Sequence, residues 1–306
     1  MGEWLISTVN VAKSFGRTDA LKGLNLQVPK GIAGFIGKNG SGKTTTIGVL
    51  LGLLKPNCGK AFVFGLDCWK ESFEIRCKLG IMHENSAYPT SFTGKRFLEY
   101  VAKIYGVTQV KQQVKRALKD VGLKNKEDEP IKAYSAGMIR RLGLAQALIG
   151  NPELAILDEP TANIDPSGRI TILETIKEIH KEQGTSFLIS THILSDLEKI
   201  CDWLSIIDSG SIVDQGYVRD LAAKYSGNIY RINTSDPYLL ASKIRDLKAV
   251  DLVWIENDTI YCKVKDPNMF CRDVPRIATE LKLQLQSLQQ MLGTLEEIYK
   301  ATAGSR

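Results

Sequence analysis

Residues 37–44 read GKNGSGKT and directly follow the apolar run GIAGFI at 31–36. The motif matches the phosphate-binding pattern G-x-x-x-x-G-K-[ST], which lies between a strand and a helix. Glycines allow backbone N–H groups to turn towards a phosphate, and Lys43 can reach the β- and γ-phosphates of a nucleotide. A chance glycine turn is the alternative, but the strand and helix patterns on both sides favour a nucleotide site, with a helix over residues 44–54. Its candidate ligands are Gly37, Lys38, Asn39, Gly40, Ser41, Gly42, Lys43, Thr44 and Thr45.

A second motif, LAILDEP at 154–160, places two acids at the end of an apolar strand. Because ligands of parallel sheets bind at the carboxyl ends of the strands, these carboxylates should face the phosphate loop. Asp158 suits coordination of Mg²⁺ together with the Thr44 hydroxyl, and Glu159 suits polarising an attacking water. Acids end many elements, so this motif predicts hydrolysis only in combination with the phosphate loop.

Length and composition predict two globular domains. The chain has 306 residues, of which 43% are hydrophobic and 24% are charged, which is enough apolar material for packed cores. No stretch approaches the roughly 18 consecutive apolar residues that a membrane-spanning helix needs. The N-terminus lacks the pattern of a secretion signal, the six cysteines show no metal-binding spacing, and the net charge of +6 comes without a dense basic block. We expect a protein that is not secreted, with reduced cysteines, and no nucleic-acid partner.

Short strand-like runs alternate with helical patterns from Leu5 to about Tyr225, which predicts an α/β fold around a mostly parallel sheet. Two helices are expected at 135–150 and 166–184, each with a favourable start and a glycine at its end. The pattern changes at Ser226-Gly227-Asn228, so we place the domains at 1–225 and 226–306. The second domain should be a small α+β unit of ferredoxin-like element order. Its expected elements are a strand at 229–233, a helix at 238–247, a hairpin at 252–255 and 259–264 that turns at Asn257-Asp258, a helix at 269–281 and a strand at 283–288.

Three further segments resemble motifs of the ATP-binding cassette (ABC) ATPases. YSAGM at 134–138 resembles their signature LSGGQ, TANIDP at 161–166 their D-loop, and STHILSDLE at 190–198 the loop with their switch histidine. The resemblance covers the first two-thirds of the chain and implies a P-loop cassette with a helical subdomain and N-terminal antiparallel strands. It also implies ATP and Mg²⁺ as ligands and ATP hydrolysis. An ordinary capped helix and a structural histidine are the alternatives for single segments. The residues that the resemblance adds are Ser135, Ala136 and Gly137, which act on the ATP of a partner subunit, Asp165, which communicates across the dimer, and His192, which senses the γ-phosphate.

The resemblance also assigns Phe15 to stacking on adenine and Glu84 to the position of the Q-loop glutamine, a ligand of Mg²⁺ and water. An aromatic residue at a strand end is more often part of the core, which is the alternative for Phe15. Glu84 and Ala136 depart from the family pattern, and both leave the rate of hydrolysis open. Ala136 would be strained only if its position required a positive φ.

The chain most resembles the branch of drug, lipid and polysaccharide exporters, whose ATPases end in a motif like SLEEIF; here TLEEIYKATAG occupies 294–304. This resemblance implies an ATPase on the cytoplasmic face of a membrane, paired with a second ATPase subunit and a transmembrane permease. We expect the permease to dock against residues 84–105. Two alternatives stay open: a soluble ABC ATPase outside transport, and a regulatory module that binds ATP without much hydrolysis.

Overall fold

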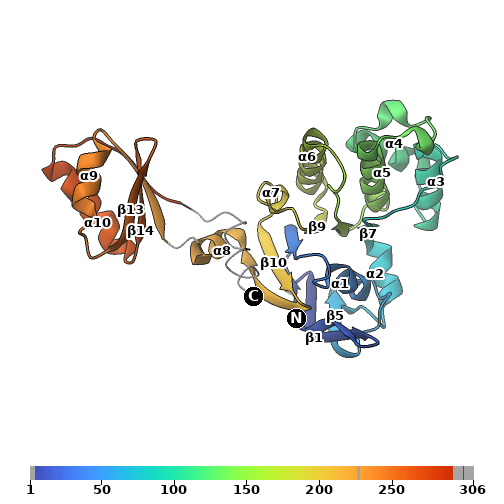
Figure 1. Ribbon diagram of the computed structural model, residues 1–306. Coiled ribbons are helices and arrows are strands. Elements are labelled where there is room, and N and C mark those ends of the chain that lie inside the picture. Colours follow the sequence, from blue (N-terminus) through green and yellow to red (C-terminus); the bar gives the residue numbers. More distant parts are fainter. Residues whose placement is uncertain (1–3, 226–227, 292–298, 300–306) are drawn as a thin grey trace. The chain divides into compact units, whose positions relative to one another are not determined.

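The computed structural model describes residues 4–225, 228–291 and 299. By their internal contacts these residues divide into two units, with the break between Val218 and Arg219 (Figure 1). The sequence places the boundary after Tyr225, and the limits of the two folding domains stay a prediction. Within the described residues, no helix has the length and apolar character needed to cross a membrane. All six cysteines are free thiols.

A mostly parallel sheet forms the centre of the first unit. Its strand order is β11-β10-β4-β9-β8-β7, and only the edge strand β11 runs antiparallel to its neighbour. Strands β4, β8 and β9 are buried along their whole length, which explains their unbroken apolar character. The carboxyl ends of β4, β7, β8 and β9 therefore meet at one edge of the sheet. The strands are β4 (Ile32–Ile36), β7 (Leu79–Met82), β8 (Leu154–Asp158), β9 (Ser186–Thr191), β10 (Trp203–Asp208) and β11 (Ser211–Tyr217).

A smaller antiparallel sheet lies against this centre and shares its core. Buried side chains of both sheets, such as Leu24 and Phe35, belong to one apolar cluster with Ile47 of helix α1. The small sheet has the order β2-β1-β5-β6, with β3 paired to β1. Its strands are β1 (Ile6–Phe15), β2 (Thr18–Leu24), β3 (Gln27–Val28), β5 (Cys58–Val63) and β6 (Leu66–Asp67).

Helices α3, α4 and α5 pack on one another, and α5 also packs on the edge strand β7 (Figure 1). Helices α3 and α5 begin with side-chain caps, because Thr93 accepts from the Arg96 N–H and Ser135 accepts from the Met138 N–H. The helices of the first unit are α1 (Lys43–Leu50), α2 (Ser72–Lys78), α3 (Gly94–Ile104), α4 (Val110–Asp120), α5 (Ala136–Leu148), α6 (Pro166–Gln183) and α7 (Leu194–Leu197), with 3₁₀ turns η1 (Lys124–Lys126) and η2 (Ile131–Ala133).

The second unit includes helix α8 (Val218–Tyr225) from Arg219 on, and after this helix come the predicted elements in the order strand, helix, strand, strand, helix, strand. Its antiparallel sheet has the order β13-β14-β12-β15, and its own apolar cluster includes Ile232, Cys262 and Phe270. This is the element order of a ferredoxin-like unit. Asn257 and Asp258 both have positive φ, as a tight hairpin turn requires. The elements are β12 (Ile229–Thr234), α9 (Pro237–Ile244), β13 (Val250–Glu256), β14 (Thr259–Val264), α10 (Pro267–Glu280) and β15 (Leu285–Gln290); the motif at 294–304 lies outside the described residues except for Tyr299.

Candidate functional site

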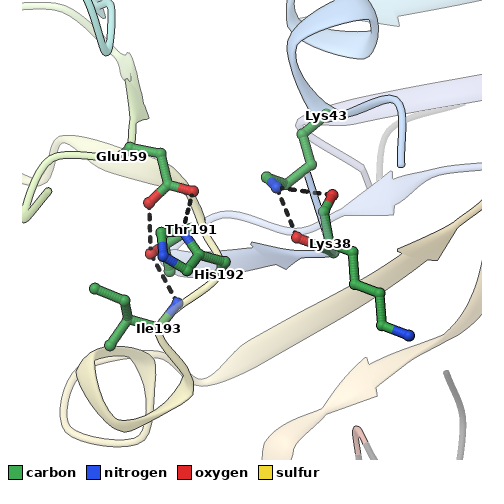
Figure 2. A network of polar contacts seen from close by, with 7 residues as sticks. Lys38, Lys43, Glu159, Thr191, His192 and Ile193 are labelled. Atoms are coloured by element: carbon green, nitrogen blue, oxygen red, sulfur yellow. Dashed lines mark hydrogen bonds and ion pairs between the residues drawn. The ribbon is translucent and has the colours of Figure 1, made fainter. Parts of the chain in front are cut away.

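The loop after β4 wraps around the amino group of Lys43. The Lys43 Nζ donates to the backbone carbonyl of Gly37 at 2.6 Å and to that of Lys38 at 3.3 Å (Figure 2). Gly40 and Gly42 have φ of 78° and 109°, values that side chains disfavour, and a Cβ on Gly42 would lie 2.8 Å from the Ala20 carbonyl. The glycines are therefore required by the backbone path of this loop. It forms the wall of a cavity of about 440 Å³ lined by Thr18, Asp19, Ala20, Lys38, Asn39, Gly40, Gly42, Lys43, Thr44, Thr45, Glu84, Asp158 and Glu159, which we call the phosphate cavity.

Glu159 is held in a fixed position at the carboxyl end of β8. It is 4% exposed and has a positive φ of 49°, which is uncommon for a residue with a side chain. Its N–H donates to the Ser190 carbonyl at 2.8 Å, the Thr191 hydroxyl donates to its Oε2 at 3.0 Å, and the His192 Nδ1 lies 2.8 Å from its Oε1 (Figure 2). Since an ionised carboxylate only accepts hydrogen bonds, the His192 Nδ1–H is the donor. The bonds from Thr191 and His192 thus hold the Glu159 carboxylate in one orientation.

Two lysines and four carboxylates line the phosphate cavity, and the carboxylates of Glu84, Asp158 and Glu159 interact with the Lys43 ammonium. Burial raises the pKa of Asp158, and the carboxylates of Glu159 and Glu84 raise it further, while Lys43 opposes them. Burial lowers the pKa of Lys43, and the same three carboxylates oppose that change. In both residues, burial disfavours the charged form of the side chain. A bound cation near the acids would relieve the repulsion among them.

The segment 134–138, which resembles the ABC signature, lies at another cavity of about 370 Å³, which we call the signature cavity. Ser135, Ala136 and Gly137 line it together with Asp165 and Asn163. Ala136 is the first residue of α5, where φ is not positive, so the strain considered for it does not arise. The Asp165 carboxylate caps α6 by accepting from the Gly168 N–H at 3.1 Å, and it also accepts from the Ser167 hydroxyl. These bonds hold the pKa of Asp165 below its usual range.

The structure brings most of the predicted residues together, but not all. The phosphate cavity unites the loop with Glu84, Asp158 and Glu159. Phe15, at the end of β1, is 49% exposed and has the Lys13 ammonium 5.3 Å from its ring centre. It is therefore not part of the core, although it is also not among the side chains that line this cavity. Gly37, Ser41 and His192 are not among the residues that line the cavity. Gly37 bonds to Lys43 and His192 bonds to Glu159, both of which line it, and Ser41 lies between Gly40 and Gly42 in the loop.

Comparison with known proteins shows which family the chain belongs to. The pattern described as ABC transporter matches residues 21–162. The chain is 30% identical over 98% of its length, and over 92% of the relative, to the daunorubicin/doxorubicin resistance ATP-binding protein DrrA of Streptomyces peucetius. It is 38% identical to the bacitracin transport ATP-binding protein BcrA of Bacillus licheniformis, over 69% of each chain. The chain belongs to the ABC transporter family.

Solved structures agree with this ABC transporter assignment. CbiO1 of Clostridium perfringens, part of the ABC transporter complex cbiONQ, matches with a TM-score of 0.65 at 26% identity, over 72% of this chain and 92% of that one. An ATP-binding subunit of another ABC transporter matches with the same TM-score at 25% identity, over 72% and 93%. The chain is thus an ATP-binding subunit of an ABC transporter and an ATPase.

Sequence reasoning missed two residues of this ABC ATPase site. Thr191 ends β9 and bonds to Glu159, and it also accepts from the Ile193 N–H at 3.1 Å. Arg140 of α5 is buried and donates to the backbone carbonyls of Glu84 and Ala162. A threonine beside the switch histidine and an arginine among the apolar residues of a helix were the only signals for them in the sequence.

Proposed function

We propose that two ATPase subunits close on two ATP molecules, each held between the phosphate cavity of one subunit and the signature cavity of the other. The observation that carries this proposal is the separation of the two cavities on one chain. Ser135 and Gly137 line the signature cavity and are absent from the lining of the phosphate cavity. Ser135 stands at the start of α5, where backbone N–H groups favour an anion. A second subunit would bring such a helix start to the exposed side of the nucleotide.

Within the phosphate cavity, the loop residues bind the phosphates and Lys43 contacts the β and γ positions. The donor set fits Mg²⁺, since Thr44, Asp158 and Glu84 all line the cavity and carry side-chain oxygen atoms. Among the described residues, no three His, Cys, Asp or Glu side chains could hold a metal by themselves. A Mg²⁺ ion usually keeps several waters and binds nucleotide phosphates, whose charge it would neutralise when bound.

For hydrolysis, we assign the proton acceptance from water to Glu159. Thr191 and His192 each fix one of its carboxylate oxygens, so the base is held in one orientation before the nucleotide arrives. The imidazole of His192 is 52% exposed, and its Nε2 is left free for the γ-phosphate while Nδ1 is engaged. Phe15 is assigned to the adenine ring, which an exposed aromatic at the end of β1 can stack upon.

The proposed transmembrane permease docks on the cytoplasmic side of the membrane, against residues 84–105. In that segment Phe97 is buried and its ring meets Tyr88 edge-on, with ring centres 5.2 Å apart; these aromatics are packed inside the helical group. Tyr100 and Ile104 lie one turn apart on α3 and are 58% and 67% exposed. Large exposed apolar side chains of this kind are typical anchors of a protein interface.

The docking proposal is tested with Tyr100→Glu and Ile104→Glu, assayed for ATP affinity and for co-purification with the transmembrane permease. Loss of the complex with unchanged ATP affinity supports docking at α3. Val213→Glu, a matched change of an exposed apolar residue on β11, should leave the complex intact. Full retention of the complex by both α3 variants contradicts the docking site.

The shared ATP sites are tested by mixing two inactive variants, Lys43→Ala and Ser135→Glu. Each alone lacks one half of both sites in a pair of identical subunits. A mixed pair contains one site with an intact Lys43 from one subunit and an intact Ser135 from the other. Phosphate release should therefore reappear on mixing, and its failure to do so, with both variants folded, contradicts the shared site. Steady phosphate release by the unsubstituted subunit also separates an ATPase from a regulatory module with little turnover.

A further inference from the structure

We propose that Arg140 is a positioning residue that transmits the state of the chain's own nucleotide to its own signature segment. Arg140 lies on α5 and is 9% exposed. Its Nη1 donates to the Glu84 carbonyl at 2.6 Å, and its Nε donates to the Ala162 carbonyl at 3.2 Å. One side chain thus joins helix α5 to two separate loops.

Both of these loops reach the phosphate cavity. Glu84 lines that cavity. Ala162 follows Glu159 in the loop after β8, and its N–H donates to the Glu159 carbonyl at 3.2 Å. Any shift of Glu84 or Glu159 on nucleotide binding therefore acts on a carbonyl that Arg140 holds.

The other end of the connection is the start of α5. Ser135 caps this helix, so a movement of Arg140 along or around the helix axis moves Ser135 as well. A cavity of about 220 Å³ separates the two loops from α5, and Glu84, Ala136, Arg140, Ala162 and Asn163 are among its lining residues. Arg140 lines this open space and bonds to a backbone carbonyl of each loop.

A guanidinium suits this task because its donors are fixed in one plane and point to separate acceptors. A buried cation whose bonds go to backbone carbonyls is expensive to retain for stability alone. The inference rests on the proposed function, in which the signature segment serves the ATP of the other subunit. Arg140 would then let the ATP in one site influence the other site.

Hydrogen exchange of the full-length chain tests this, with and without a non-hydrolysable ATP analogue and Mg²⁺. In the unsubstituted chain the nucleotide should slow exchange both in the phosphate loop (37–46) and at the signature segment (134–141). In Arg140→Met the loop should stay protected, while the nucleotide effect at 134–141 should fall about tenfold, a common size for coupling between sites. Arg140→Lys keeps the charge but loses the two-pronged geometry, so it should lose most of the effect too.

Arg76→Met is the matched control, because Arg76 of α2 also donates to a backbone carbonyl, that of Leu51 at 3.1 Å, away from both cavities. It should behave as the unsubstituted chain does. Measurements at two protein concentrations separate the effect from subunit pairing, since only protection by pairing grows with concentration. Equal nucleotide protection of 134–141 in Arg140→Lys or in folded Arg140→Met overturns the inference. Absence of protection at the phosphate loop of the unsubstituted chain would instead remove the assigned nucleotide site, and the inference with it.

Discussion

The change Glu159→Gln tests the assignment of the catalytic base most directly. A glutamine keeps the shape of the side chain, and its carbonyl oxygen can still accept from the Thr191 hydroxyl. Its amide can donate to the Nδ1 of the other His192 tautomer, so the position of the side chain should be kept. The cost to folding is then at most that of one altered hydrogen bond, about 1 kcal/mol.

The effect on catalysis should be much larger. A positioned general base contributes roughly 10²- to 10⁴-fold to the rate, which corresponds to about 2.7–5.4 kcal/mol of barrier. Because Glu159 donates nothing to the phosphates, KM for ATP should hold while kcat falls by that factor. The assays are steady-state phosphate release and direct titration of ATP, and size exclusion should show a stable ATP-bound dimer.

Glu153→Gln is the control, since Glu153 directly precedes the same strand and its side chain forms an exposed ion pair with Lys78 at 3.6 Å, which contributes little. It should hydrolyse ATP at the rate of the unsubstituted protein. If kcat of Glu159→Gln stayed within about threefold of that rate, too little for a positioned base, the base would have to be another group and the reasoning from Thr191 and His192 would fail.

Four further predictions concern binding, charge and domain structure. Lys43→Ala should weaken ATP binding by about 1.5–3 kcal/mol, the value of a charge-assisted hydrogen bond, as measured by titration calorimetry; unchanged affinity would contradict the loop assignment. Phe15→Ala should weaken ATP and GTP binding alike, because stacking does not distinguish the bases' hydrogen-bonding edges, and a loss for only one nucleotide would refute it. Burial raises the pKa of Asp158 in the folded state, so the ionised carboxylate destabilises the fold above that pKa, and this cost vanishes in acid, where Asp158 is protonated in both the folded and the unfolded state. Asp158→Asn should therefore raise the melting temperature at neutral pH and lose that gain in acid. The same change should weaken Mg²⁺-dependent ATP binding. A chain that ends at Tyr225 should stay folded and bind ATP, whereas loss of soluble expression would mean that the two parts share one core.

Local sequence predicted the elements whose geometry depends on neighbouring residues. The sequence predicts a glycine-rich phosphate loop, and Gly40 and Gly42 have the positive φ that glycine allows. It also predicts the hairpin turn at Asn257-Asp258, and both of these residues have positive φ. Helix α6 begins at Pro166, after the cap Asp165, as the pattern of its first residues indicates. Each of these is decided within a few positions along the chain.

The missed features depend on residues far apart in sequence. Arg140 meets Glu84 across 56 positions, and Thr191 meets Glu159 across 32, so no local pattern could show either bond. The positive φ of Glu159 follows from the contacts that hold it and not from its residue type. Similarly, the sequence predicts permease docking against residues 84–105 as a whole, and only the packing of α3 and α5 shows that Phe97 within this segment is buried.

The separation of the phosphate and signature cavities has a genetic consequence. If subunits pair as proposed, a copy with a defective signature damages the ATP site of whichever subunit it joins, even when that subunit is intact. In a cell that makes both versions from two genes, most pairs would then carry a faulty site, so the mutation would be dominant. A lesion at Ser135 should therefore impair transport in the presence of a normal gene, whereas a mutation that merely unfolds the chain, and so prevents pairing, should be recessive.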